Sequence, residues 1–491
     1  MFLKEKYDAA GNFEKIKARL VADGSTQDRS DFDEEDIASP TASLESIFNV
    51  LKLVAVEKRH LLIFDIGGAY LNAEIDRTVY MFIEPELVNI LVNINSGYAK
   101  YRDVKGRILT QIDKAMYGLV QSAKLWYETI TGVLKDNGYS PNPMDPCVWN
   151  KIVGGDQITI VIYVDDLAIS CRNKDEVHNA MEMVKSKFID IKVKESNEMS
   201  YLGMNLKIDN DGIQVSMASY IQDMMKEFGE LWEYTHPADE KLFVNDGEVP
   251  SKDKKNFHKM VAKLLYLCKR GRPDVALPVH YLCTRVQNPT DADDRKLARI
   301  MGYLKGTMGN VRKIGSKPFD RVEAYIDAAH ACHEDGFGQS GGAIMVSDAM
   351  VEVITRKQKC AARDSTEAAL VALEGLLLYV EWHDEWFRGQ GYDLEKPLIY
   401  QDNTSTITLV TKGGGKMRNK TMRVKQAVIL EGFQNHDYEF KYIQTDYMVT
   451  DMFTKALSGI KYYRFKRVIM GNGQESKAAG VRGNKAKNGY G

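Results

Sequence analysis

Residues 160–170 read IVIYVDDLAIS, in which two apolar runs rich in β-branched residues enclose two adjacent carboxylates, Asp165 and Asp166. Apolar runs with a short polar break predict a β-hairpin, here with both aspartates at its tip. Neighbouring ionised carboxylates repel each other unless a cation lies between them, and Mg²⁺ usually binds through one or two carboxylates plus substrate phosphates. An isolated Asp-Asp pair is better explained as a solvated turn, so the metal-site interpretation depends on what surrounds the hairpin.

A second acidic element lies in residues 61–72, LLIFDIGGAYLN, where a buried strand runs into Asp65 and then a pair of glycines. Asp65 could serve as the third carboxylate ligand of a two-metal site shared with Asp165 and Asp166. The glycine pair Gly67-Gly68 would let backbone amides approach a phosphate closely. The alternative for Asp65 is that it only caps the end of a strand.

The length and composition of the chain limit the classes of protein to which it can belong. A chain of 491 residues is too long for one core, so two to four domains are expected. The net charge of -2 means that any surface that binds a polyanion must be local. Six cysteines without a CxxC pair indicate neither a zinc site nor a disulfide framework, and a reducing intracellular compartment is the simplest inference. The N-terminus lacks a secretory signal, and no apolar run is long enough to span a membrane.

Basic residues mark two further segments. Residues 1–24 predict a hairpin that presents Lys17 and Arg19 on one face, which fits a contact with phosphate and a solvated strand face equally well. Residues 257–306 predict helices broken at 271–273, and basic residues recur through them. A charged outer helix face and a nucleic-acid track are equally supported here. These residues are Lys263, Lys269, Arg270, Arg272, Arg285, Arg295, Lys296 and Arg299.

The second half of the chain carries four carboxylates at strand ends or at the start of a helix. Residues 309–320 bear glycine, lysine and proline, and they predict a domain boundary. Beyond them, two strands, a helix and a third strand predict a sheet at whose edge carboxylates can converge. Four such groups could hold two divalent ions over a scissile phosphate, or some could only cap helices. They are Asp327 after a strand, Glu367 in the first turn of a helix over 365–387, Asp402 after a later strand, and Asp451.

Residues 1 to roughly 460 resemble the reverse transcriptase and ribonuclease H region of Ty1/copia-type retrotransposon polyproteins. The matching motifs follow the family's order along nearly the whole chain, and this order makes the resemblance specific. They are Lys17-Ala-Arg-Leu-Val-Ala22, Asp65 with Ala69-Tyr70-Leu71-Asn72, Tyr117-Gly-Leu-Val-Gln121 with Trp126-Tyr127, Tyr163-Val-Asp-Asp166, Tyr201-Leu-Gly203, Arg272-Pro-Asp274, Tyr303-Leu-Lys-Gly306, Asp327-Ala328, Ser365-Thr-Glu367, Asp402-Asn403, and Asp451 with Phe453-Thr-Lys455.

The resemblance implies a multidomain fold of the α+β and α/β classes, a right-hand polymerase followed by a ribonuclease H-like domain. The expected divisions are fingers and palm at 1–200, thumb at 201–250, connection at 251–315, the ribonuclease H-like domain at 321–460, and a tail at 461–491. This basic tail is expected to be disordered, since it has almost no apolar content after residue 471.

The resemblance also implies roles for individual residues. Asp65, Asp165 and Asp166 would be catalytic metal ligands of the polymerase, and Asp327, Glu367, Asp402 and Asp451 would be those of the ribonuclease H. Tyr70 would exclude a 2′-hydroxyl, Gln121 would contact the incoming nucleotide, and Lys17 and Arg19 would lie near its triphosphate.

The implied cofactor is Mg²⁺, two ions per active site, with Mn²⁺ as a substitute. The implied partners are an RNA template, a DNA primer, an RNA–DNA hybrid and deoxynucleoside triphosphates, without a membrane; the oligomeric state is left open. The implied location is intracellular, in cytoplasmic virus-like particles and in the nucleus.

Several positions depart from the family pattern. Gly67-Gly68 stands in place of a Lys-Thr pair, Val120 and Ala123 replace a lysine and a proline, Ala329-His330 replaces Asp-Trp, and Thr421 stands where a catalytic-loop histidine is common. The resemblance places the start of the chain inside the fingers, and zinc-cluster and acid-protease signatures are absent from the sequence. A catalytically decayed or domesticated nucleic-acid-binding remnant is therefore the alternative to an active polymerase.

Overall fold

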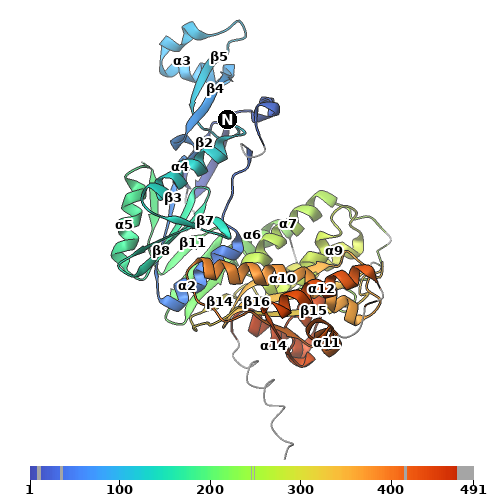
Figure 1. Cartoon of the computed structure of the whole chain (residues 1–491). Helices are drawn as coiled ribbons and strands as arrows, with labels where there is room; N and C mark the ends of the chain where they lie inside the picture. Colours follow the sequence, from blue (N-terminus) through green and yellow to red (C-terminus); the bar gives the residue numbers. More distant parts are fainter. Residues whose placement is uncertain are drawn as a thin grey trace, which may run out of the picture. The chain divides into compact units, whose positions relative to one another are not determined.

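The computed structural model of the chain describes residues 1–7, 13–33, 37–188, 190–229, 231–244, 246–247, 249–413, 417 and 419–472 (Figure 1). Contacts divide the chain into two compact units. The first unit comprises Met1–Ala42, Leu61–Pro141 and Pro146–Lys194, and the second unit comprises Ser43–His60, Asn142–Asp145 and Glu195–Gly491. Each helix in the described ranges is too short or too polar to cross a membrane.

The first unit is built on a six-stranded sheet in the order β10-β3-β9-β8-β7-β6. Strands β8 and β9 form the antiparallel hairpin predicted from residues 160–170, and Tyr163 pairs with Asp166 at its end. Consecutive residues of both strands are buried, so this part of the sheet is covered on both faces, and near-continuous apolar runs are typical of such strands. The elements are β3 (His60–Ile66), β6 (Ser140–Asn142), β7 (Asp145–Val153), β8 (Asp156–Tyr163), β9 (Asp166–Cys171), β10 (Ile191–Lys194), and helices α4 (Ser122–Asp136) and α5 (Lys174–Lys185).

Two antiparallel ribbons complete the first unit. Strands β1 and β2 pair as the predicted N-terminal hairpin, with Lys17 opposite Lys4, and residues 8–12 between them lie outside the described residues. Strands β4 and β5 pair in the second ribbon. The elements are β1 (Phe2–Tyr7), β2 (Phe13–Arg19), the 3₁₀ helix η3 (Ala69–Asn72), β4 (Glu74–Ile83), α3 (Pro85–Ile94) and β5 (Ile108–Lys114).

The second unit contains an antiparallel four-stranded sheet in the order β11-β12-β13-β14 and a group of helices. The predicted helical break at 271–273 is confirmed, because one helix ends at Arg270 and a 3₁₀ turn follows. The segment 309–320, predicted as a boundary, includes a strand that pairs with β13. The elements are β11 (Glu198–Tyr201), β12 (Met204–Asp209), β13 (Gly212–Ser216), α6 (Ala218–Phe228), α7 (Lys254–Arg270), η5 (Pro273–Val275), α8 (Ala276–Cys283), α9 (Asp291–Gly306) and β14 (Arg312–Gly315).

A five-stranded sheet in the order β17-β16-β15-β18-β19 forms the rest of the second unit. Strands β15, β16 and β17 are antiparallel, whereas β18 and β19 run parallel to β15. Helix α10 lies against β15 and β16 and contacts α12 (Figure 1). This mixed sheet, preceded by antiparallel sheets, confirms the predicted fold class. The elements are β15 (Glu323–Ala329), β16 (Gln339–Val346), β17 (Ala349–Lys357), α10 (Ser365–Gly389), β18 (Leu398–Gln401), α11 (Thr404–Lys412), α12 (Lys420–Gln434), β19 (Glu439–Tyr442), α13 (Asp451–Thr454) and α14 (Gly459–Ile469).

Three features of this half differ from the predictions. Strands β17 and β19 were not expected, and the first part of the segment expected as a disordered tail from residue 461 is helical, because α14 occupies Gly459–Ile469 with Tyr462, Phe465 and Ile469 buried. Residues 473–491 of the predicted tail lie outside the described residues. The predicted divisions near residues 200, 250 and 315 stay predictions.

Helix α2 (Leu44–Glu57) groups with the second unit although it lies in the range expected for fingers and palm. Its Lys52 side chain is fully buried, and its ammonium pairs with Asp348 at 2.7 Å and donates to the Gly315 carbonyl at 2.8 Å. A buried ammonium is costly unless it is paired and hydrogen-bonded. These contacts therefore tie α2 to the ends of β14 and β16.

Candidate active sites

The first carboxylate cluster forms where the β8–β9 hairpin meets the end of β3. Val164, at the hairpin tip, has a φ of 57°, which is unusual for a β-branched residue. The Ile66 amide donates to the Asp165 carbonyl at 2.9 Å, so the residue next to Asp65 is joined directly to the tip. Backbone strain of this kind persists where surrounding contacts enforce it, and it concentrates at functional sites.

The three carboxylates of this cluster interact electrostatically. Burial raises the pKa of Asp166, and the negative charges of Asp165 and Asp65 raise it further, while Lys194 opposes them. The three predicted polymerase carboxylates thus lie within one electrostatic neighbourhood. A set of half-buried carboxylates that repel one another favours the binding of a cation between them.

Gly67 has a different role from the one predicted. Its amide donates to the Asp190 carbonyl at 2.6 Å, and a Cβ atom at this position would lie 1.9 Å from the Asp190 carboxylate. The interpretation of this amide as a phosphate contact was therefore wrong, because the amide is already used inside the protein. The same crowding explains why no side chain, including the family's usual lysine, fits here without a shift of Asp190.

Tyr70 lies beside the carboxylate turn. Its ring centroid is 4.6 Å from that of Tyr117, and burial together with the charge of Asp165 raises its pKa. Tyr70, Val164 and Ala123 help to line a cavity of about 140 Å³ in the first unit. The indole of Trp126 donates to the Val164 carbonyl at 2.7 Å and so supports the hairpin tip from this cavity.

The three other predicted nucleotide-binding residues differ in their surroundings. The Arg19 guanidinium lies 5.1 Å from the Tyr117 ring centroid and lowers the pKa of Tyr117, which burial and then Asp165 raise. Arg19 therefore belongs to the same neighbourhood as Tyr70, while Lys17 is exposed on β2. Gln121 is only 1% exposed, and its amide group contacts Gln27 at 3.2 Å. A contact between Gln121 and a nucleotide would require this pair to open.

The second carboxylate cluster forms at one edge of the five-stranded sheet. Strands β15 and β18 are parallel, with Tyr325 opposite Tyr400, and Asp327 and Asp402 each follow two residues later. Asp451 begins α13, which contacts β15 and β16. The structure thus brings these three predicted residues to the same edge, as expected for carboxylates placed at strand ends.

The contacts in this cluster are specific. Asp327 accepts a hydrogen bond from the Thr454 hydroxyl at 2.7 Å, and Asp451 is bound by two ammonium groups, those of Lys455 and Lys461. Burial raises the pKa of Asp327; Lys455 opposes this shift, and the charges of Asp451 and then Asp402 add to it. From the sequence, Lys455 was identified only as part of a motif. Lys461 was missed, because no local pattern distinguishes it from other surface lysines.

Glu367 stands apart from these contacts. It lies in the first turn of α10, where one of its carboxylate oxygens accepts the Arg363 amide at 2.9 Å and its own amide donates to Asp364 at 2.9 Å. These are capping contacts, which the sequence had offered as the alternative for this residue. A metal-binding role for Glu367 stays a prediction.

The donor chemistry of both clusters fits a divalent ion, since carboxylate oxygens are the hard ligands that Mg²⁺ prefers. Among the described residues, however, no three histidine, cysteine, aspartate or glutamate side chains are already gathered in a geometry that could hold a metal ion. Asp165 and Asp166 repel each other electrostatically in this state, and Lys455 and Lys461 take up the oxygens of Asp451.

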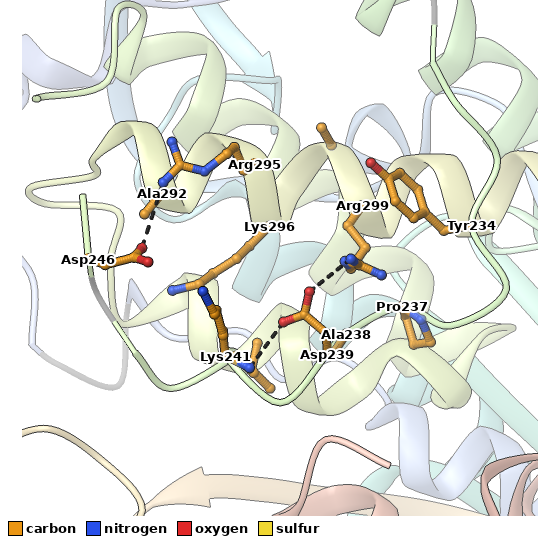
Figure 2. A pocket seen from close by; sticks show the side chains of 12 residues that line it. Tyr234, Pro237, Ala238, Asp239, Lys241, Asp246, Ala292, Arg295, Lys296 and Arg299 are labelled. Atoms are coloured by element: carbon orange, nitrogen blue, oxygen red, sulfur yellow. Dashed lines mark hydrogen bonds and ion pairs between the residues drawn. The ribbon is translucent and has the colours of Figure 1, made fainter. Parts of the chain in front are cut away.

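Some of the basic residues of 257–306 form internal ion pairs, and others line a pocket. Arg272 is buried against Asp274 at 2.8 Å, and Arg285 pairs with Asp293 at 3.1 Å, so these two are structural. Figure 2 shows the pocket, of about 340 Å³, lined by α9 and the loop that contains Lys241. Its lining includes the basic side chains of Lys241, Arg295, Lys296 and Arg299 and the acidic side chains of Asp239 and Asp246.

Most of the charges in this pocket are already paired. Arg299 pairs with Asp239 at 2.8 Å and lies over the Tyr234 ring, and Arg295 lies 3.6 Å from Asp246. The Lys241 ammonium has no partner in the part of the chain that the structure describes. The pocket therefore combines an aromatic ring, paired arginines and one available cation.

Comparisons with known proteins find similar sequences over most of this chain. Residues 2–237 match the family described as reverse transcriptase (RNA-dependent DNA polymerase). The Pol polyprotein of transposon RE1 from Arabidopsis thaliana is 25% identical over 95% of this chain and 31% of its own length, and that of transposon TNT 1-94 from Nicotiana tabacum is 26% identical over 95% of this chain and 35% of its own. The chain thus spans about a third of these relatives.

A solved structure of prototype foamy virus protease-reverse transcriptase is 10% identical over 94% of this chain and 50% of that chain, with a TM-score of 0.24. Taken with the order of motifs along the sequence, the family match and the curated relatives define the relationship. Residues 2–237 match the reverse transcriptase family, and the chain is similar over most of its length to the Pol polyproteins of Ty1/copia-type retrotransposons.

Proposed function

We propose that this chain is an RNA-directed DNA polymerase that adds deoxynucleotides to a primer and also cleaves the RNA strand of RNA–DNA hybrids. The observation that carries the proposal is the hydrogen bond from the Ile66 amide to the Asp165 carbonyl, at 2.9 Å, which joins the end of β3 beside Asp65 to the turn that bears Asp165 and Asp166. The charges of Asp65 and Asp165 accordingly add to the burial that raises the pKa of Asp166. The three carboxylates would hold two Mg²⁺ ions, which supply charge neutralisation at the attacking primer oxygen and at the leaving pyrophosphate.

The chain's own residues would mainly position the reactants. Trp126 holds the Val164 carbonyl and so fixes the turn that presents Asp165 and Asp166. Arg19 would lie near the triphosphate, and Tyr70 would bound the space beside the sugar. Positioning and charge compensation account for most of the catalysis in phosphoryl transfer, since the protein forms no covalent bond with the substrate.

In the same proposal, Asp327, Glu367, Asp402 and Asp451 form the second active site, which would hydrolyse RNA with metal-activated water. Recognition there would depend on the shape of the hybrid and on its 2′-hydroxyl groups. We expect the protein to act inside the cell, in cytoplasmic virus-like particles and in the nucleus.

Primer extension on an RNA template with Mg²⁺ and deoxynucleotides tests the proposal. An active polymerase extends the primer to the end of the template, and chelation of the metal stops it. A folded chain that binds the primer–template but never extends the primer in Mg²⁺ or Mn²⁺ would support the alternative of a nucleic-acid-binding remnant.

Replacement of Tyr70 by Ala or Val is expected to raise the incorporation of ribonucleotides. The ring would no longer fill the space beside the sugar, where it now packs on Tyr117 and lines a cavity. The measurement is kcat/KM for matched ribo- and deoxynucleotides. Tyr70→Phe serves as the control, because it keeps the ring and should keep the ratio. An unchanged ratio in Tyr70→Ala would mean that Tyr70 is only a packing residue.

Replacement of Lys241 by Gln is expected to weaken the binding of an RNA–DNA hybrid for every sequence tested. We propose that this ammonium contacts a backbone phosphate at the pocket in Figure 2. Loss of one phosphate contact should reduce the slope of log affinity against log salt concentration by about 1. Fluorescence anisotropy with a labelled hybrid over a salt series measures this slope. Lys226→Gln, which removes an exposed lysine already paired with Asp223, is the matched control.

A further inference from the structure

One ammonium group occupies the centre of the second carboxylate cluster. The Lys455 Nζ atom lies 2.5 Å from a carboxylate oxygen of Asp451 and 3.5 Å from one of Asp327. The positive charge of Lys455 also interacts with Asp402. Three of the four carboxylates assigned to the second active site therefore share this single cation.

The burial of these carboxylates explains why a cation is needed. Asp451 is 1% exposed and Asp327 is 6% exposed. Buried charges are costly unless they are paired and hydrogen-bonded. Lys455 supplies this compensation, and the Lys461 ammonium, 2.6 Å from the other Asp451 oxygen, adds to it from α14.

The Lys455 side chain is also placed so that it can move away from the two carboxylates. Its backbone amide donates to the Asp451 carbonyl at 2.8 Å, which anchors the main chain, but its side chain is 43% exposed. The side chain can therefore turn into solvent without disturbing the core of α13. Asp451 would keep Lys461 as a partner on one oxygen while its other oxygen becomes available.

We propose that Lys455 is a built-in counter-cation of the second active site, which a divalent ion must displace from Asp451 and Asp327 in order to bind. The inference rests on the proposed function of this cluster as a metal site. It adds that metal binding here is an exchange of one cation for another. The affinity for the metal is then set partly by how tightly residue 455 holds the carboxylates.

The test measures Mg²⁺ and Mn²⁺ binding by calorimetry on the full chain, with Asp165 and Asp166 both changed to Asn to silence the first cluster. Lys455→Met removes the competing charge, and we expect affinity to rise about five- to tenfold, as for one unit charge at a partly exposed position. Lys455→Arg should lower the affinity, because a planar guanidinium holds carboxylates in a bidentate manner and is harder to displace.

Thermal unfolding gives a second readout that does not depend on activity. In EDTA, Lys455→Met should have a lower Tm than the parent chain, because the buried carboxylates lose their counter-charge. Addition of Mn²⁺ should then raise its Tm by more than that of the parent chain. A role of Lys455 in packing alone would lower the Tm in both conditions equally.

The outcomes separate this inference from the function on which it rests. Equal metal affinity in the Met and Arg variants, with binding abolished by Asp327→Asn, would overturn the displacement model and leave the metal site in place. Loss of binding in Lys455→Met would also overturn it, since Lys455 would then support the site instead of competing for it. Absence of binding in the parent chain and all variants would overturn the metal site itself.

Discussion

Replacement of either Asp165 or Asp166 by Asn is expected to abolish DNA synthesis without unfolding the protein. Asparagine keeps the size of the side chain but removes a negative charge from the hairpin tip, where burial and the neighbouring carboxylates already raise the pKa of Asp166. Loss of a metal ligand should cost several kcal/mol of transition-state stabilisation, and each ~1.4 kcal/mol is tenfold in rate. Primer extension on an RNA template, with circular dichroism to check the fold, measures the effect.

Asp156→Asn is the matched control, since Asp156 begins β8 at the end of the strand remote from the turn that bears Asp165 and Asp166. This variant should extend primers at the rate of the parent chain. Near-normal extension by the Asp165→Asn or Asp166→Asn variants would mean that the pair is only a solvated turn, and the assignment of the polymerase centre would fail.

Glu367→Gln is expected to eliminate cleavage of RNA in a hybrid and to leave primer extension largely unchanged. Glutamine can still accept the Arg363 amide, so the capping contact at the start of α10 survives while the negative charge proposed to bind metal is lost. The carboxylates proposed for the polymerase lie in the first unit and the other four in the second unit, so each proposed site belongs to its own core. Asp165→Asn should have the reverse effect on the two activities.

Parallel assays on the same preparations, one for primer extension and one for hybrid degradation, test this separation. Glu385→Gln, an exposed position on α10, is the control. Loss of both activities in folded Glu367→Gln would contradict the two-site model. Full retention of cleavage would show that Glu367 only caps its helix, as its contacts with Arg363 and Asp364 allow.

The parent chain is itself expected to cleave hybrids slowly. The family resemblance implies a catalytic-loop histidine at the position of Thr421, whose backbone amide donates to the Asn419 side chain at the start of α12. No imidazole is then available at this position to move a proton, a loss worth about 10²-fold in rate. The metal site would remain, so the residual activity should depend strongly on the divalent ion.

The sequence alone determined the elements whose signal is local. The β8–β9 hairpin, helix α10 and the helices on either side of 271–273 follow from apolar periodicity and from breaks at glycine and proline. The order of motifs then identified the family and placed Asp65, Asp165, Asp166, Asp327, Asp402 and Asp451 at strand or helix ends. The structure groups them into two clusters.

Only the tertiary structure decided which partners these residues meet. The crowding of Gly67 by Asp190, the burial of Gln121 against Gln27 and the contact of Lys461 with Asp451 all join residues distant in the chain. Strands β17 and β19 likewise depend on pairing with β16 and β18. Propensity and periodicity act over a few residues, whereas burial and ion pairing depend on what the fold brings close. For this reason, the carboxylates of the two clusters could be predicted from sequence, but the lysine that pairs with Asp327 and Asp451 in the second cluster could not.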